Sequence, residues 1–84
     1  MKILFDYSKL RGLIKEKYGS EKRFADHLSF SSVTLNRRLN NHAFFDQNEI
    51  MEVCHLLDIP DYKKSEYFFT PIVRKTEPKE MVSQ

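Results

Sequence analysis

The stretch EKRFADHLSFSSVTLNRRLNN, residues 21–41, decides the fold of this chain. It opens with a segment of helical spacing, whose apolar residues recur at i, i+1 and i+4 as Phe24, Ala25 and Leu28. Ser20 stands directly before this segment, where a serine caps a helix by accepting a hydrogen bond from a free backbone N–H. The pattern therefore predicts a short helix over residues 21–28.

A second short helix is expected after a tight connection. Either Ser31 or Ser32 can cap it, and its two leucines, Leu35 and Leu39, share one face. Asn41 tolerates the left-handed backbone conformation that commonly ends a helix. These residues predict two short helices joined by a turn.

The outward face of the second helix follows from its two leucines. With about 100° per residue, directing both leucines inward sends Val33, Arg37 and Asn40 to the opposite side. Thr34 and Asn36 lie on its flanks. A single exposed valine beside charged residues is also what an ordinary solvated helix face presents. The pattern of this face alone therefore does not show whether it contacts solvent or a ligand, and the distribution of charge along the chain is needed as well.

Charge is unevenly distributed along the chain. No Asp or Glu occurs from His27 to Phe45. Residues 1–45 carry nine Lys or Arg against four acids, a net +5, whereas residues 46–84 carry five against eight, a net −3. A polyanion explains the missing acids, and arginine, asparagine and an aliphatic side chain can contact guanine, adenine and a thymine methyl group.

The remaining segments also predict helices. Asp6 can cap a helix from Tyr7 to about Tyr18, with Gly19 at its end. In the second half of the chain, Asp46 and Glu49 have capping-box spacing. An apolar stripe of helical spacing follows them, formed by Ile50, Val53, Cys54 and Leu57. A shorter helix is expected after Asp61, ended by Pro71.

The predicted fold is an all-α, compact bundle of about five short helices. Residues 1–70 are expected to form the binding domain, and residues 71–84 a polar, flexible tail. The chain has 84 residues, which suits one small domain and disfavours a large catalytic cleft, so no enzyme activity is predicted.

Several ligands and locations are disfavoured by residue type and spacing. The single cysteine, Cys54, cannot form an internal disulfide, and with His27, His42 and His55 it makes no zinc-binding spacing. No cofactor, metal or small-molecule substrate is therefore expected. No amino-terminal apolar run suits a signal peptide or a membrane span, so a cytoplasmic protein is expected.

The segment EKRFADHLSFSSVTLNRRLNN resembles the helix-turn-helix of the lambda-repressor-like (Cro/repressor, or XRE) family, above all its small phage-type members. The matching positions are Ala25, Leu28, Ser31, Thr34, Leu35, Arg37, Leu39 and Asn40. The segment FDQNEIMEVCHLLDIP resembles the fourth helix of that family, and the resemblance covers about residues 6–70. Ser29 departs from the usual turn glycine, which predicts a strained or altered turn.

The resemblance implies roles for two groups of residues. The residues at or beside base-reading positions are Ser31, Ser32, Val33, Asn36 and Arg37. The residues expected at phosphates are Ser20, Lys22, Thr34, Arg38, Asn40, Asn41 and His42. For Arg38 the alternative to a phosphate is an acidic side chain, and for Glu21 the alternatives are a cytosine amine or the start of its own helix.

The expected function is sequence-specific binding of double-stranded DNA in the major groove, as a phage-type transcriptional repressor or Cro-like regulator. The alternative is an antirepressor or antitoxin module that uses the same fold mainly to bind a protein partner. Both readings allow a homodimer or a regulatory protein partner.

The aromatic residues of the second half bear on that alternative. A domain this small cannot easily bury all of Tyr67, Phe68, Phe69, Ile72 and Val73. These residues are therefore expected either to mediate self-association or partner docking, or to close the core. Phe44 and Phe45 likewise fold back under the fourth helix or lie at an interface.

Overall fold

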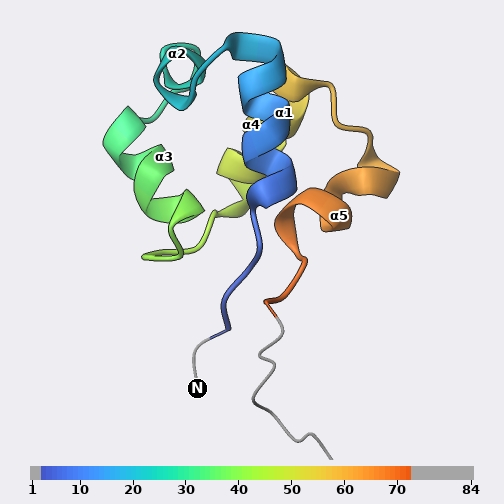
Figure 1. Ribbon diagram of the computed structural model, residues 1–84. Helices are drawn as coiled ribbons and strands as arrows, with labels where there is room; N and C mark the ends of the chain where they lie inside the picture. Colours follow the sequence, from blue (N-terminus) through green and yellow to red (C-terminus); the bar gives the residue numbers. More distant parts are fainter. Residues whose placement is uncertain (1–2, 73–84) are drawn as a thin grey trace, which may run out of the picture.

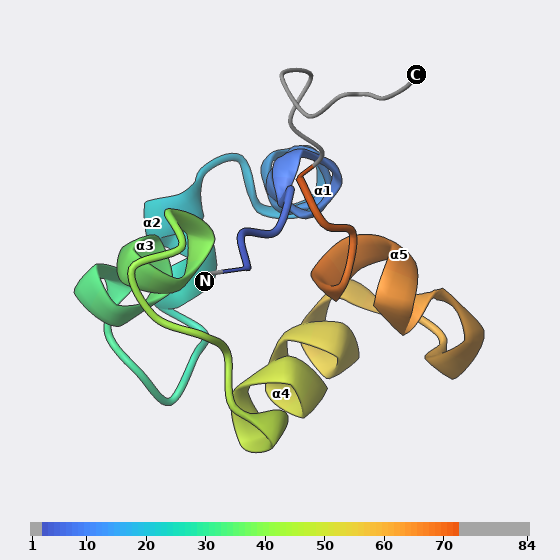
Figure 2. The same ribbon diagram turned by 90° about the horizontal axis from the view of Figure 1, so that it is seen from below.

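The computed structural model describes residues 3–72, which form five short α-helices and one turn of 3-10 helix. The elements are α1 (Ser8–Tyr18), α2 (Glu21–Ala25), α3 (Ser32–Leu39), α4 (Gln47–Leu57), the 3-10 turn η1 (Asp61–Lys63) and α5 (Lys64–Phe68). Figure 1 and the view from below in Figure 2 place α2 and α3 on one side and α5 on the other, with α1 and α4 between them. The predicted all-α bundle of five helices is confirmed.

Side-chain caps begin three of the helices. Ser20 accepts from the N–H of Arg23 at 3.1 Å, and Ser31, not Ser32, accepts from the N–H of Thr34 at 3.2 Å. Asp46 and Glu49 form the predicted capping box, in which each side chain accepts from the backbone N–H of the other. These predictions held because a cap depends only on residues close in sequence.

Two helix boundaries differ from the prediction. α1 begins at Ser8, because the Asp6 carboxylate accepts from the N–H of Ser8 ahead of the helix and Tyr7 occupies the N-cap position without a side-chain bond. α2 ends at Ala25, three residues before the predicted end, and a turn follows. Gly19 has a φ of 89° after α1, in agreement with its predicted role.

The core contains aliphatic residues from α1, α3 and α4 and aromatic residues from several segments. Phe45 packs beneath α4, with its ring edge-on to those of Tyr7 and Phe68 at centroid distances of 5.5 and 5.2 Å. Cys54 is buried in the same core, as its place on the apolar stripe of α4 predicted, and burial raises the pKa of its thiol.

The two ends of the described chain pair with each other. The N–H of Asp6 donates to Thr70 O at 2.7 Å, and the N–H of Ile72 donates to Leu4 O at 2.9 Å. The backbone of Phe5 between them faces the other way. Its N–H and C=O both bond to the Asn41 amide at 2.9 Å. The loop after α3 is thereby fixed to the amino-terminal segment.

Candidate functional site

The outer face of α3 carries the five residues predicted to read bases. Val33 is 68% exposed, and Ser31, Ser32, Asn36 and Arg37 are also exposed. A shallow hollow of about 400 Å³ lies between α2 and α3, lined by Glu21, Lys22, Ser32, Val33, Asn36 and Arg37. The structure therefore brings four of the five residues together in one hollow, while the Ser31 hydroxyl caps the helix beside it.

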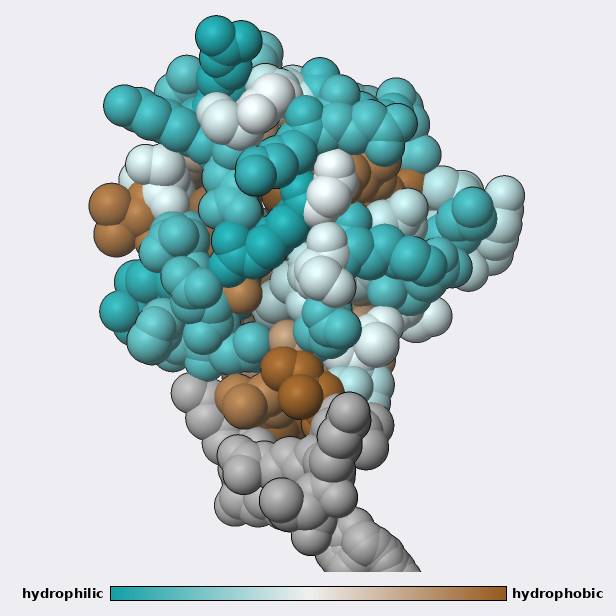
Figure 3. All heavy atoms as spheres, in the orientation of Figure 1, coloured by the Kyte–Doolittle hydropathy of each residue, from teal (hydrophilic) through white to brown (hydrophobic). Residues whose placement is uncertain are grey.

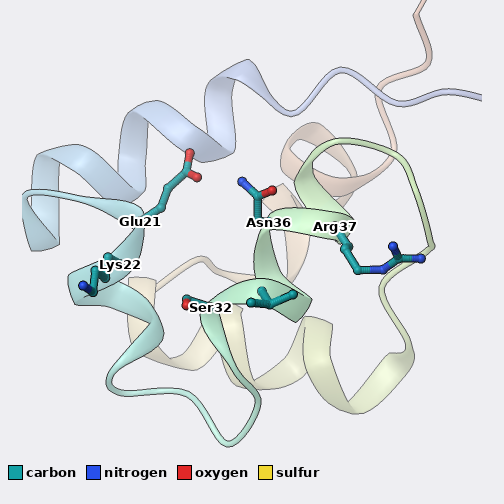
Figure 4. A pocket seen from close by; sticks show the side chains of 6 residues that line it. Glu21, Lys22, Ser32, Asn36 and Arg37 are labelled. Carbon is teal, nitrogen blue, oxygen red and sulfur yellow. The ribbon is translucent and has the colours of Figure 1, made fainter.

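The side chains around this hollow, which we call the α3 hollow, point in different directions (Figure 4). The Asn36 amide and the Glu21 carboxylate both extend toward α1, whereas Arg37 extends away toward the loop that follows α3. Within residues 3–72, neither Lys22 nor Arg37 forms an ion pair. Both cationic groups are therefore available to an anionic ligand.

A chain of hydrogen bonds connects the α3 hollow to α1. Arg11 Nη1 donates to Glu21 Oε2 at 2.6 Å, and Arg11 Nη2 donates to Asn40 Oδ1 at 2.8 Å. Asn40 Nδ2 then donates to Asn36 Oδ1 at 3.0 Å. Glu21 thus binds Arg11, and Ser20 rather than Glu21 caps α2. This role of Arg11 could not be predicted from the sequence, because its partners lie 10 and 29 residues away.

Two of the predicted phosphate ligands are engaged elsewhere. Arg38 forms a bidentate pair with Glu49, at 2.9 Å from Nε to Oε1 and 3.1 Å from Nη2 to Oε2. Hydrogen bonding to Glu49 raises the pKa of the Arg38 guanidinium. Glu49 is the acidic side chain that was predicted as the alternative to a phosphate for Arg38. Asn41 uses both amide atoms on the backbone of Phe5. A phosphate contact by either side chain stays a prediction, and it would require these hydrogen bonds to be given up.

The other predicted phosphate ligands differ in availability. The hydroxyl of Ser20 caps α2, and that of Thr34 accepts from Ser31 at 3.2 Å. Asn40 belongs to the hydrogen-bond chain from Arg11. Lys22 and His42 are exposed, with no side-chain hydrogen bond in the part of the chain that the structure describes.

The turn before α3 is unstrained. Both the N–H and the hydroxyl of Ser29 donate to the Glu52 carboxylate of α4, at 2.6 and 2.7 Å. Within residues 3–72 a positive φ is found only at Gly19, Asn41 and Asp58. Of the two predicted alternatives, strain is therefore excluded and an altered turn geometry is left, because Ser29 has no positive φ that would require a glycine.

A second surface lies where the chain ends meet. Phe44 and Phe69 are 58% and 51% exposed, and each packs edge-on against Phe5 at a centroid distance of 6.1 Å. A hollow of about 200 Å³ there, the aromatic hollow, is lined by Phe5, Tyr7, Phe44, Phe45, Ile50, Phe68 and Phe69. Figure 3 shows apolar surface gathered at this end of the molecule.

The carboxyl-terminal aromatic residues divide between core and surface. Phe68 is 2% exposed and belongs to the core, so of its two predicted roles the structure supports the closing of the core and not a place at an interface. Tyr67 is half-buried, whereas Phe69 and Ile72 are exposed beside the aromatic hollow. Val73 lies outside the described residues. One short segment therefore contributes both to the core and to the exposed apolar surface.

Two kinds of feature are absent from the part of the chain that the structure describes, metal-binding clusters and membrane-spanning helices. No group of three or more His, Cys, Asp or Glu side chains is placed to hold a metal ion within residues 3–72. None of the helices in that range is long and apolar enough to cross a membrane.

The described residues thus form a small all-helical protein that has two surface features, a cationic helix face and an aromatic hollow. The chain belongs to the DUF739 family, described as "Protein of unknown function", whose model matches residues 3–71. This membership corrects the assignment to the lambda-repressor-like family. The matching positions that suggested that family are apolar and polar residues of two short helices, and they do not distinguish between families that share them.

A solved structure supports the same correction. The chain is similar to the modulator of repression (MOR) of the temperate bacteriophage TP901-1 from Lactococcus lactis, determined in solution. The two are 34% identical with a TM-score of 0.69, over 77% of this chain and 88% of that one. A comparison with curated proteins finds no match.

Proposed function

We propose that this chain is a phage-type regulator that modulates repression by binding a protein partner, and that it acts by binding alone without catalysing a reaction. Its similarity to the MOR protein supports a regulatory role. The docking surface would be the aromatic hollow, with Phe44 and Phe69 as the anchoring side chains.

The exposed rings of the aromatic hollow carry this proposal. Burying a phenylalanine side chain fully contributes about 1.5–3 kcal/mol, and this domain leaves Phe44 and Phe69 each more than half exposed. Aromatic anchors at the centre of a hollow are typical of residues that dominate protein binding. A partner that covers these rings would gain the burial that the isolated domain lacks.

The test is a titration with the repressor encoded by the same phage or prophage genome as this chain. Phe69→Ala and Phe44→Ala should each weaken binding about 30-fold, which corresponds to about 2 kcal/mol. The matched control is Tyr62→Ala, because Tyr62 is also an aromatic residue and is 82% exposed, but it lies on η1 and does not line the hollow.

Two results would contradict this proposal. One is equal affinity of all three variants for the repressor. The other is concentration-dependent sedimentation of the chain alone that Phe69→Ala abolishes, which would make a second copy the occupant of the hollow.

A second candidate function is binding of duplex DNA by the α3 hollow. It is favoured by the exposed Lys22 and Arg37, by the outward Val33, and by the pairing of the one nearby acid, Glu21, with Arg11. Binding should weaken steeply with salt, because each neutralised phosphate contributes about −0.9 to the slope of log K against log salt. A flat salt response or no binding at low salt would rule it out.

A further inference from the structure

Chemistry fixes the direction in which Arg11 takes part in its hydrogen-bond chain. A guanidinium has five N–H donors and no acceptor. Its two contacts, with Glu21 Oε2 and with Asn40 Oδ1, are therefore donations by Arg11. The side-chain amide of Asn40, which can turn either end toward a neighbour, must present its oxygen to Arg11.

This orientation is passed on to α3. With Oδ1 of Asn40 facing Arg11, its Nδ2 donates to Asn36 Oδ1 at 3.0 Å. Asn36 therefore uses its oxygen on Asn40 and leaves both N–H groups of its amide for a ligand. Figure 4 shows this amide at the edge of the α3 hollow, on the side facing α1.

The other groups in the hollow favour the same kind of ligand. Lys22 is a donor, and Ser32 can donate its hydroxyl hydrogen. Glu21, which alone among the lining residues is an acid, is held by Arg11. The α3 hollow is therefore rich in donors, and it suits a ligand that presents hydrogen-bond acceptors.

We infer that Arg11 is a specificity-determining positioning residue, which makes Asn36 a donor and directs α3 to keto bases in duplex DNA. In the major groove guanine and thymine present carbonyl oxygens and no amino group, cytosine presents only an amino group, and adenine presents an amino group beside its N7 acceptor. Bidentate binding of adenine requires both the oxygen and the nitrogen of an asparagine amide. The inference rests on the proposed binding of DNA, and it replaces the expected pairing of asparagine with adenine.

The experiment reverses the direction of the chain while keeping the ion pair. In the double variant Arg11→Glu with Glu21→Arg, the carboxylate at position 11 still pairs with a guanidinium on α2. A carboxylate only accepts, so Asn40 turns its Nδ2 toward α1 and Asn36 presents Oδ1 to the ligand. Selection from a random duplex pool should then show a change of about tenfold or more at one position, from guanine or thymine to adenine or cytosine.

Two single variants serve as controls for this selection. Arg11→Lys, which also only donates, should keep the preference of the natural chain. Asn36→Ala should remove the preference at that one position, and the exchange of residues 11 and 21 should then have no effect there. An unchanged base preference in the double variant would overturn the inference.

Hydrogen exchange of the side-chain amides tests the orientation without DNA. In the natural chain an Nδ2 proton of Asn40 should exchange slowly with solvent, and both Nδ2 protons of Asn36 rapidly. In the double variant Asn40 should keep a slow Nδ2 proton, which it donates to the carboxylate at position 11, and one Nδ2 proton of Asn36 should become slow because it donates to Asn40 Oδ1. The same pattern in both proteins would overturn the role of Arg11. If neither protein binds any duplex at low salt, DNA binding and the base assignment both fall, while the exchange pattern still decides whether Arg11 orients the amides.

Discussion

At the scale of single residues, two residues in the same backbone conformation can make different contributions to stability. Asn41 and Asp58 both end a helix region in the left-handed conformation, with φ of 63° and 56°. Asn41 also binds the Phe5 backbone through both amide atoms. Within residues 3–72 the side chain of Asp58 makes only a surface pair with Lys17 at 3.6 Å. The two residues therefore carry different shares of stability.

Glycine substitutions should separate these shares. Glycine adopts a positive φ without strain, so Asp58→Gly should leave the free energy of unfolding within about 0.5 kcal/mol or raise it slightly. Asn41→Gly should instead lower it by about 1 kcal/mol, because two half-buried hydrogen bonds are lost. Urea unfolding of both variants measures the difference. Equal free energies of unfolding would show that the hydrogen bonds of the Asn41 amide do not stabilise the fold.

Arg37 and Arg38 are adjacent in sequence but should affect different properties. Arg38 is paired with Glu49, and the two side chains are 20% and 12% exposed. Arg38→Met should lower the free energy of unfolding by about 2 kcal/mol, because the Glu49 carboxylate is left without its partner. Arg37→Met should leave stability unchanged and weaken duplex binding. Thermal melting and a DNA titration of each variant measure both effects. A loss of stability in Arg37→Met, or a loss of duplex binding in a folded Arg38→Met variant alone, would contradict these separate roles.

The wheel of α3 predicted the outward position of Val33 and Arg37, because helical geometry fixes which side chains oppose the buried leucines. It could not assign Arg38 or Asn41. Their partners, Glu49 and Phe5, lie 11 and 36 residues away in the sequence. Helical spacing predicts which side chains of α3 face outward, but it cannot predict contacts between segments that are distant in the sequence.

At the scale of elements, local sequence determined where most helices begin. The caps of α2, α3 and α4 involve residues three apart, so spacing alone identifies them. The end of α2 was missed because the chain continues from Ala25 in turns with bonds between residues three apart, His27 N to Phe24 O and Leu28 N to Ala25 O, which keep the apolar spacing of a helix. The family was missed for a related reason, since short helices with similar caps and stripes occur in more than one family.

The capping box of α4 gives a prediction at this scale. Asp46→Ala should lower the free energy of unfolding by about 1 kcal/mol, because the N–H of Glu49 loses its acceptor at 2.8 Å. Asp46→Asn should cost much less, since an asparagine oxygen can accept the same bond. Chemical denaturation of the two variants provides the comparison. A loss as large in Asp46→Asn would show that the charge, and not the cap, stabilises the helix.

At the scale of the whole molecule, five short helices support two surfaces of opposite chemistry. The α3 hollow is polar and rich in donors, whereas the aromatic hollow is lined entirely by apolar and aromatic residues. No residue lines both. The chain ends and the loop after α3 meet at the aromatic hollow, because Asn41 fixes that loop to Phe5. A single small core can therefore present both surfaces without sharing side chains between them.

This separation predicts that the two surfaces act independently. Phe69→Ala should weaken binding of the protein partner and leave the affinity for duplex DNA unchanged, and Arg37→Ala should do the reverse. The double variant should show the sum of the two free-energy changes within about 0.5 kcal/mol, because side chains without shared contacts usually contribute additively. Titrations of all three variants with the repressor and with duplex DNA measure this. A coupling above about 1 kcal/mol would mean that one ligand spans both hollows or that α3 moves when the aromatic hollow is filled.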